Sequence, residues 1–486
     1  MRVARGCREL GIRSVAVFSD PDAGAPHVRM ADEAYPLGGI TPAESYLRGD
    51  LIVEVARRAG ADAVHPGYGF LAENPEFAAA CAEAGLKFVG PTPAAMRALG
   101  SKTAARKTMQ AAGVPVVPGT VDPIPTAEEA AAVAREIGFP IALKAVSGGG
   151  GKGMRVVERP DDLEAAFRQA SSEALASFGD PSMYLERLVV RPRHVEVQVL
   201  ADEHGNVVHL GERECSIQRR HQKLVEESPS PVVDADLRAR MGAVALRAAQ
   251  AVGYTNAGTC EFLLDRDGNF YFLEVNARLQ VEHPVTELVT GIDLVHQQLR
   301  VAAGERLDFT QDDIRPVGHA IECRIQAEDA ANQFFPSTGR VEAVHEPSGP
   351  GIRIDGALEA GQQVTPFYDP MLAKLIVWAE TREAAIRRMR RALGEYLVLG
   401  VKTTIPFHRW LMEHPAFRTG ELDTAFLERH WLPSGEPPEG LAEVAALVAA
   451  IVAHQGRAAH RPVRATADGA EDRWASFARR AGLRVP

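Results

Sequence analysis

The alternation of apolar and polar residues over the first hundred positions predicts short strands separated by amphipathic helices. Strand-like and helical runs follow one another at 14–19, 45–60, 62–67, 74–85 and 87–90. Strands joined by helices pair in parallel, so we expect a Rossmann-like parallel sheet. The chain begins inside a further helical run, 2–11, with no strand before it. The sheet is therefore expected to lack its first strand.

The pattern becomes a mixture of helices and antiparallel hairpins in the middle of the chain. A helix is expected at 126–138, where a threonine precedes the helical pattern and a glycine ends it. Strands at 140–146 and 153–158 are joined by a glycine-rich loop. The segments 194–212 and 259–276 have the alternation of hairpins, with His-Gly-Asn and Asp-Gly at their turns. This part of the chain is expected to be α+β.

Strands and turns dominate again beyond residue 319, and the C-terminal region is expected to be mainly β. An amphipathic helix follows at 381–397, and its arginines are interpreted as a solvated face. Residues 433–440 have the composition of a linker. The apolar run 441–456 is too short to span a bilayer, so we expect a helix buried against the body or a partner.

Composition and charge exclude several classes of protein. Hydrophobic residues make up 46% and charged residues 24% of the 486 residues, which is ordinary for a globular chain of about three domains. The formal charge of −10 disfavours nucleic-acid binding unless a local basic patch supplies it. No run of about 18 apolar residues occurs, and the N-terminus lacks the apolar core of a signal peptide. We expect a cytoplasmic protein with no nucleic-acid or membrane partner.

The glycine run before Met154 is the first candidate for chemistry. Gly148, Gly150 and Gly153 satisfy the GxGxxG count, but a strand follows where a dinucleotide fingerprint requires a helix. Lys152 is not followed by Ser or Thr, so the run is not a Walker loop either. A glycine loop between two strands can close its backbone N–H groups over phosphates, and Lys144 in the preceding strand suits an anionic partner. The alternative is a mobile hairpin tip without a ligand.

The second hairpin predicts a metal site. If Asp267-Gly268 is a two-residue turn, Glu261 stands directly opposite Glu274. Two carboxylates so placed repel each other, and a bridging cation removes the conflict. Together with Asn276, two residues further along the same face, they supply oxygen ligands that suit Mg²⁺. The alternative is a register shifted by one residue, which would expose both glutamates to solvent.

The residues after this hairpin continue the same face. Arg278 and Gln280 alternate with Leu279, and a guanidinium with an amide donor could hold a small oxyanion. Glu282 shares their parity and could act as a base toward that anion. The alternative is ordinary ion pairing at the surface.

A dense group of cations and hydrogen-bond donors at 211–223 suits a phosphate site, or else is a solvated loop. Cys215, within it, is interpreted as a small packed side chain. The five cysteines form no CxxC pair, which favours a reducing compartment and argues against zinc. They are Cys7, Cys81, Cys215, Cys260 and Cys323.

Seven strings of residues in one order resemble biotin carboxylase, the ATP-grasp component of biotin-dependent carboxylases, over about residues 1–430. They are HPGYGF (65–70), SGGGGKGM (147–154), ERLVVRPRHVEVQV (186–199), ERECSIQRRHQKLVEESP (212–229), EFLLDRDGNFYFLEVNARLQVEHPVTE (261–287), GHAIECRIQAED (318–329) and YDPMLAKLIV (368–377).

The resemblance implies an α/β and α+β multidomain fold. We expect an N-terminal domain at 1–100 that is truncated by its missing strand. An ATP-grasp domain is expected at 101–318, with a glycine-loop lid at about 117–190. A mainly β C-terminal domain would follow at 319–430, and a linker or extension at 431–486.

The resemblance also implies roles for individual residues. Glu282 matches the base that deprotonates bicarbonate, and Arg324 matches the group that stabilises the biotin enolate. Lys223, Arg278, Gln280 and Val281 match contacts to bicarbonate and carboxyphosphate. Glu261, Glu274 and Asn276 match ligands of Mg²⁺ or Mn²⁺. The ATP-binding set would be Lys102, Lys144, Gly148, Gly149, Gly150, Gly151, Met154, Glu186, Leu188, His194, Gln218 and His221, with Glu186 and Leu188 near the adenine.

The implied reaction is ATP-dependent carboxylation of biotin by bicarbonate through carboxyphosphate, as the first half-reaction of a biotin-dependent carboxylase whose acceptor is expected to be an acyl-CoA. No Met-Lys pair, the biotinylation signature, occurs. The biotin is therefore expected on a separate carrier protein or domain, or on a longer polypeptide of which this chain is a fragment. We also expect a homodimer and a partner carboxyltransferase. The alternatives are a relative of carbamoyl-phosphate synthetase and an inactive protein that only assembles with other carboxylase chains.

Overall fold

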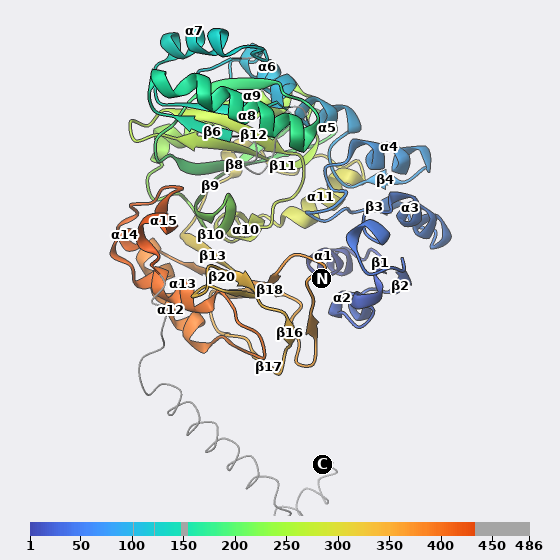
Figure 1. The fold of residues 1–486 in the computed structure, drawn as a ribbon. Helices are drawn as coiled ribbons and strands as arrows, with labels where there is room; N and C mark the ends of the chain where they lie inside the picture. The colour runs from blue at the N-terminus through green and yellow to red at the C-terminus, as the bar shows by residue number, and fades with distance from the viewer. Residues whose placement is uncertain (101, 121, 147–153, 433–486) are drawn as a thin grey trace, which may run out of the picture. The chain divides into compact units, whose positions relative to one another are not determined.

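The computed structural model describes residues 1–100, 102–120, 122–146 and 154–432 (Figure 1). The expected glycine loop at 148–151, the linker at 433–440 and the helix at 441–456 lie outside these residues. Within the described ranges, every helix is too short or too polar to cross a membrane.

The N-terminal region contains two parallel strand pairs, as its alternating pattern predicts. β1 pairs with β2 and β3 pairs with β4, each as a separate two-stranded sheet. The second strand of the first pair was missed by the sequence analysis. The elements are α1 (Arg2–Glu9), β1 (Val15–Phe18), α2 (Pro26–Met30), β2 (Glu33–Pro36), α3 (Gly49–Arg58), β3 (Ala63–Val64), α4 (Pro75–Glu83), β4 (Lys87–Phe88) and α5 (Pro93–Gly100).

A small antiparallel sheet and two covering helices follow. The strand order is β6-β5-β7, and the two helices share one apolar core with the sheet. Thr126 caps α7 by accepting a hydrogen bond from the Glu129 amide, as the sequence predicts. The elements are α6 (Lys102–Ala111), α7 (Ala127–Ile137), β5 (Ile141–Ala145), β6 (Met154–Val157), α8 (Leu163–Phe178) and β7 (Met183–Arg187).

An eight-stranded antiparallel sheet, in the order β12-β11-β8-β9-β10-β13-β20-β18, forms the centre of the molecule. Three helices, α9 (Ala235–Ala251), α10 (His283–Thr290) and α11 (Leu294–Ala302), pack against it. Its strands are β8 (Arg193–Ala201), β9 (Val207–Arg219), β10 (Gln222–Ser228), β11 (Asn256–Leu264), β12 (Phe270–Asn276), β13 (His319–Gln326), β18 (Ile352–Gly356) and β20 (Met371–Ala379).

The C-terminal strands β13, β20 and β18 extend the central sheet, because β13 pairs with β10. The sheet thus continues across residue 318, while the domain boundaries stay predictions. Four helices then form the largest apolar core with the inner face of these strands (Figure 1). They are α12 (Arg382–Glu395), α13 (Ile405–Glu413), α14 (Pro415–Thr419) and α15 (Phe426–His430).

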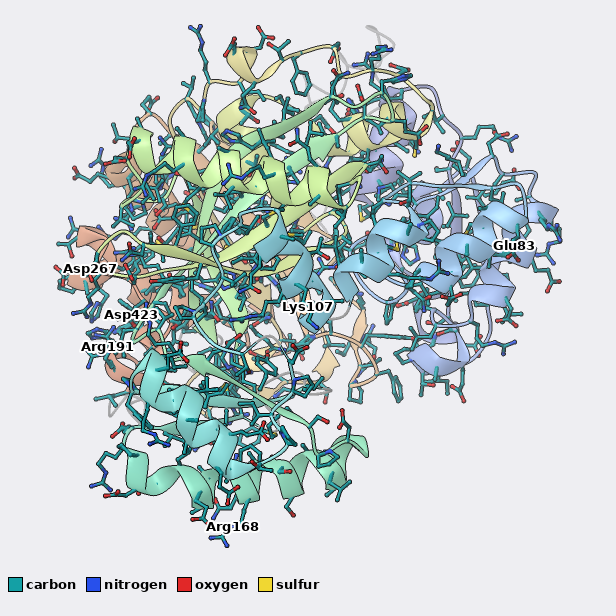
Figure 2. The ribbon with its side chains drawn as sticks, turned by 90° about the horizontal axis from the view of Figure 1, so that it is seen from above. Glu83, Lys107, Arg168, Arg191, Asp267 and Asp423 are labelled. Carbon is teal, nitrogen blue, oxygen red and sulfur yellow. The ribbon has the colours of Figure 1, made fainter. Side chains whose placement is uncertain are left out.

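Short elements complete this region. Three small antiparallel pairs are β14 (Glu328–Asp329) with β15 (Phe335–Pro336), β16 (Gly339–Arg340) with β19 (Gln363–Val364), and β17 (Ala343–His345) with β21 (Leu397–Leu399). Four 3-10 turns span Asp20–Asp22, Pro42–Glu44, Pro160–Asp162 and Gln311–Asp313. In Figure 2, Asp423 and Arg191 lie at one margin of the molecule, where the Thr424 amide donates to the Pro192 carbonyl at 3.0 Å.

The two faces of the central sheet differ in chemistry. On β8, Val195, Val197 and Val199 point into an apolar core that they share with α9. The alternate residues on this strand point to the opposite face and are also buried, although they are polar: His194, Glu196 and Gln198. A buried polar face is costly unless its groups are paired, so this face is where a site is expected.

The β11–β12 hairpin corrects one detail of the sequence prediction. The pairs nearest the turn are Leu264 with Phe270 and Leu263 with Tyr271, so Asp267-Gly268 is not a two-residue turn. A bulge at Leu273 then shifts the register by one residue, and Glu261 does pair with Glu274. The predicted juxtaposition is confirmed, although the predicted turn was wrong.

The buried pair of Glu227 and Arg382 leads to a prediction about stability. Burial alone would raise the pKa of Glu227, but Arg382 and His319 lower it to about 2. The carboxylate therefore stabilises the fold above the unfolded value of 4.5, and this contribution is lost as the pH falls toward 2. Glu227→Gln should cost about 3–5 kcal/mol at neutral pH in urea denaturation, because Arg382 stays buried without its partner.

The matched control for this measurement is Glu383→Gln. Glu383 pairs with Arg387 on the exposed side of α12, and such pairs contribute below about 0.5 kcal/mol. Equal losses in the two variants would contradict the structural role assigned to Glu227.

Candidate active site

A cavity of about 610 Å³ lies between the small sheet and strand β12. It brings together residues from segments far apart in the sequence, including Glu73 of the N-terminal region. Six of the predicted site residues line it: Lys144, Met154, Glu186, His221, Glu274 and Asn276. Its size and its mixture of apolar and charged walls suit a nucleotide-sized ligand.

A compact charge pair forms one wall of this cavity. Lys144 on β5 donates from Nζ to Glu186 Oε2 at 2.5 Å, and Arg106 on α6 binds the other carboxylate oxygen. Strands β5 and β7 are neighbours, which explains why residues 42 positions apart meet here. Both carboxylate oxygens of Glu186 thus have a cationic partner at the cavity wall.

Several members of the predicted ATP-binding set are not placed at this wall. Leu188 is not among the lining residues, and its amide donates to the Pro140 carbonyl at 2.9 Å. The side chain of Lys102, the first residue of α6, is not described, and neither is the loop 148–151.

Lys223 is the centre of a second, buried cluster. Its Nζ lies 2.5 Å from Glu196, 2.8 Å from Glu261 and 2.6 Å from Glu282. Burial would lower the pKa of Lys223, but the three carboxylates raise it well above its ordinary value. An ammonium has three donors, and here each has one acceptor.

Glu261 is held by cations on both oxygens. Its Oε1 accepts from Lys223, and its Oε2 lies 2.8 Å from His194 Nε2. Burial alone would raise the pKa of Glu261, but Lys223 and His194 hold it well below its usual range. Gln218 lies behind His194, with its amide nitrogen 3.0 Å from the imidazole Nδ1. His194 and Gln218 thus lie in the buried cluster rather than on the cavity wall.

Glu282 lies between two cations and is fully buried. Lys223 binds its Oε1, and Arg324 donates from Nη2 to its Oε2 at 2.9 Å. Burial would raise the pKa of Glu282, but Lys223 and Arg324 keep it well below its ordinary value. Glu282 is also the N-cap residue of α10, so the start of this helix fixes its position.

The segment after β12 presents its alternate residues to one face, as predicted. Arg278 donates to Asn276 Oδ1 at 3.1 Å and to Gln280 Oε1 at 3.2 Å. Gln280 lies 3.4 Å from Glu261, and Val281 offers its carbonyl to Lys374 at 2.6 Å. These residues are buried or half-buried, so the alternative of ordinary surface ion pairing does not describe them.

The three predicted metal ligands fit a hard divalent cation. Glu261 and Glu274 are cross-strand partners, and Asn276 is two residues beyond Glu274 on the same strand. The Asn276 amide nitrogen donates to Glu261 Oε1 at 2.8 Å, so these two side chains lie side by side. Carboxylate and amide oxygens are the donors that Mg²⁺ and Mn²⁺ prefer.

The sequence analysis missed the residues that support this cluster from below. Arg213 is fully buried and binds Glu196, Gln198 at 2.7 Å and both Thr286 and Thr259 at 3.0 Å. The sequence of β8 contained an indication of this buried polar face, because its polar residues alternate with valines in a strand that is too apolar to lie at the surface. Glu73 was missed as well; it accepts from Arg278 at 2.9 Å, and no pattern in the sequence around it indicates this contact.

The chain matches three family models in succession. They are "Biotin carboxylase, N-terminal domain" at 1–96, "Carbamoyl-phosphate synthase L chain, ATP binding domain" at 101–310 and "Biotin carboxylase C-terminal domain" at 322–429.

Three similar proteins span most of the chain. A pyruvate carboxylase polypeptide of Methanothermobacter thermautotrophicus is 54% identical over 88% of this chain and 87% of its own length. Biotin carboxylase of a Nostoc species is 52% identical over 88% and 96%. The crystallised biotin carboxylase domain dimer of Hydrogenobacter thermophilus 2-oxoglutarate carboxylase, in complex with MgADP, ADP and bicarbonate, is 48% identical, covers 88% and 94%, and has a TM-score of 0.83.

The small sheet over a nucleotide-sized cavity, together with the charged face of the large sheet, defines an ATP-grasp enzyme, an ATP-dependent ligase. At the identity and coverage just given, the chain belongs to the biotin carboxylase family.

Replacing Lys223 by methionine should make stability depend strongly on pH. With Lys223 present, the depressed pKa values of Glu261 and Glu282 mean that their contribution is full above pH 4.5 and lost below it. Without the cation, burial raises both pKa values, the folded state binds more protons, and stability falls as the pH rises. We expect a loss of about 3–5 kcal/mol at about pH 8 in urea denaturation, and a smaller loss at about pH 5.

Lys107→Met is the control, because Lys107 forms an exposed pair with Asp122. Its change should stay below about 1 kcal/mol at either pH. A loss in Lys223→Met that is equal at both pH values would contradict the charge-neutralising role of Lys223.

Proposed function

We propose that this chain carboxylates biotin, borne on a carrier protein, with bicarbonate and ATP through a carboxyphosphate intermediate. The observation that carries the proposal is the continuous line of contacts from the cavity to Arg324, which passes through Asn276, Glu261, Lys223 and Glu282. This line offers a place for a nucleotide phosphate at one end and for a second reactant at the other.

ATP would occupy the cavity, with Lys144, Glu186 and His221 at its wall. The predicted contacts of Lys102, Leu188 and the glycine loop 148–151 belong to the same proposal. Glu261, Glu274 and Asn276 would hold Mg²⁺ or Mn²⁺, which neutralises phosphate charge when bound. The relative from Hydrogenobacter thermophilus, crystallised with MgADP, ADP and bicarbonate, supports a nucleotide, Mg²⁺ and bicarbonate as the bound species.

Bicarbonate would bind beside Arg278, Gln280 and Val281, within reach of Glu282. Glu282 takes the bicarbonate proton, and the resulting oxyanion attacks the γ-phosphorus of ATP while ADP leaves. Carboxyphosphate then breaks down to CO₂ and phosphate, and this phosphate takes the ureido N–H proton of biotin. Arg324 stabilises the resulting enolate, whose ureido nitrogen attacks the CO₂.

The contacts of Glu282 explain how a carboxylate of such low pKa can act as a base. Without substrate, Lys223 and Arg324 both bind it and hold the proton off. An anion that binds to Lys223 and Arg324 takes the place of Glu282 as their partner. The carboxylate of Glu282 then becomes more basic, because burial opposes its charge. The site therefore gains a base only when its anionic substrate is present.

The partners follow from the same assignment. Relatives of this chain are named biotin carboxylase or parts of larger carboxylases, so we infer a biotin carrier protein or domain as its partner. A homodimer, a partner carboxyltransferase, a cytoplasmic location and an acyl-CoA as final acceptor complete the proposal. Relatives of this chain are named for pyruvate and 2-oxoglutarate carboxylases, so the acceptor is tested by pairing the protein with each class of carboxyltransferase.

The reaction itself is tested with free biotin. Bicarbonate-dependent ATP cleavage, measured as ADP release, should rise when biotin is added, because biotin consumes the CO₂ that carboxyphosphate releases. Cleavage that is indifferent to biotin at every concentration would favour an enzyme of the carbamoyl-phosphate synthetase type.

Glu282→Gln and Arg324→Ala test the two assigned roles. Each should lower biotin carboxylation by about 100-fold or more, since a base or an oxyanion-stabilising cation is lost. Mg-ATP affinity, measured by calorimetry, should be unchanged, because neither side chain lines the cavity. Glu413→Gln, at an exposed pair on α13, is the control for both assays. Lost nucleotide affinity in either variant would contradict the assignment.

A further inference from the structure

Two glutamates that the proposed mechanism does not use lie side by side beneath Arg324. Glu226 on β10 pairs in register with Glu322 on β13, and both side chains are 0% exposed. Directly opposite residues on neighbouring strands have Cβ atoms about 5 Å apart and point to the same face. The two carboxyl groups can therefore reach each other.

Most of the oxygens of this pair have no partner. Glu226 Oε1 accepts from Arg324 at 2.6 Å, but Glu226 Oε2 and both oxygens of Glu322 form no hydrogen bond within the described part of the chain. A buried, unpaired carboxylate costs several kcal/mol. Two of them in contact would add mutual repulsion, and a single shared proton removes both penalties.

Among the described residues, the surrounding cations form no hydrogen bond to Glu322. Lys374 on β20 stands opposite Arg324, and its charge lowers the pKa of Glu322 without outweighing burial. The Lys374 Nζ donates to the Val281 carbonyl at 2.6 Å and lies 3.6 Å from Asp355 on β18. Lys223 on β10 is occupied by its three carboxylates.

Helix α10 covers this face, and the charges that it brings are already paired. It contributes the carboxylates of Glu282 and Glu287, the second of which is bound by Arg2 and Arg353. Burial lowers the pKa of His283 well below its usual value, so its imidazole is neutral. The remaining contacts around Ile376, the neighbour of Glu322 on β20, are apolar and come from Val285 and Val289.

We propose that Glu226 and Glu322 share one proton and that this protonated pair is the device that positions Arg324. With one negative charge, the pair binds Nε and Nη2 of the guanidinium through a single oxygen, Glu226 Oε1, and Nη2 still reaches Glu282 Oε2 at 2.9 Å. With two negative charges, it would draw Arg324 away from Glu282 and from the reactant. Glu226 and Glu322 are positioning residues, since neither lines the cavity.

The titration of the two groups agrees with this geometry. Burial raises the pKa of Glu226 to about 7 despite the contact with Arg324, and burial raises the pKa of Glu322 well above its ordinary value. Because both values are raised, the proton stays on the pair at neutral pH and leaves it as the pH rises. The availability of Arg324 should therefore fall on the alkaline side.

This inference rests on the proposed role of Arg324 toward biotin, so its test has one readout that is independent of activity. Infrared difference spectra of the whole protein, wild type minus Glu322→Gln at neutral pH, should contain the C=O band of a protonated carboxylic acid. In Glu226→Gln, Glu322 stays buried without a partner carboxylate, so the band should remain but shift in frequency, which covers the case in which one variant fails to fold. A band that persists unchanged in both variants would overturn the shared proton, whether or not the protein carboxylates biotin.

The second readout is the pH profile of the KM for biotin. In the wild type this KM should rise on the alkaline side, and in Glu322→Gln the rise should move by about one pH unit or more, because the amide cannot lose a proton. Glu226→Gln should raise the KM for biotin about tenfold at all pH values, as expected for a lost hydrogen bond to a charged group. The KM for ATP should not change.

The outcomes separate this inference from the proposed function. If the wild type never carboxylates biotin, the proposed function is contradicted. The infrared result still shows whether Glu226 and Glu322 share a proton. If Glu322→Gln is active and its pH profile of the KM for biotin coincides with that of the wild type, the positioning role toward Arg324 is overturned. This holds even if the infrared band of the carboxylic acid is lost.

Discussion

One buried lysine makes the charged face of the central sheet possible. Lys223 contacts Glu196, Glu261 and Glu282, which come from two different strands and the start of a helix. Removing three carboxylates from water is tolerated only where a cation meets each of them at short range. Lys223 thus adds to the pairing of β8 with β11 and to the contacts of Arg213 in tying these strands to the start of α10, and the residues proposed for base and metal chemistry contact it directly or through Glu261.

The same face shows a graded use of charge. Arg213 is fully buried and binds Glu196, Gln198, Thr259 and Thr286, whereas Lys223 and Arg324 both bind Glu282, the proposed base. A cation that is saturated by protein groups fixes structure, and a cation whose partner can be exchanged for a substrate can also do chemistry. The fold places the first kind behind the second.

The sequence predicted the juxtaposition of Glu261 with Glu274 correctly because hairpin pairing is a local property. Glu261 and Glu274 are close in sequence, and the core pair of Phe262 with Phe272 leaves few registers open. The turn itself was predicted wrongly, since alternation cannot reveal a bulge. The juxtaposition of Arg324 with Glu282 was not predictable from periodicity, because it depends on pairing between β10 and β13; only the resemblance to a family pointed to Arg324. Arg213 and Glu196 were missed for the same reason, as their burial is set by long-range packing.

The pairing of β10 with β13 also has a consequence for synthesis of the chain. These neighbours in the sheet are separated by α9, the β11–β12 hairpin, α10 and α11, all of which leave the ribosome first. Until β13 emerges, β10 is an edge strand with free backbone groups, and unpaired edges attract other chains. A nascent or truncated polypeptide that stops before residue 319 would therefore expose an aggregation-prone strand edge next to an incomplete site. Pairing of β13 with β10 then completes the site and protects this edge in the same step.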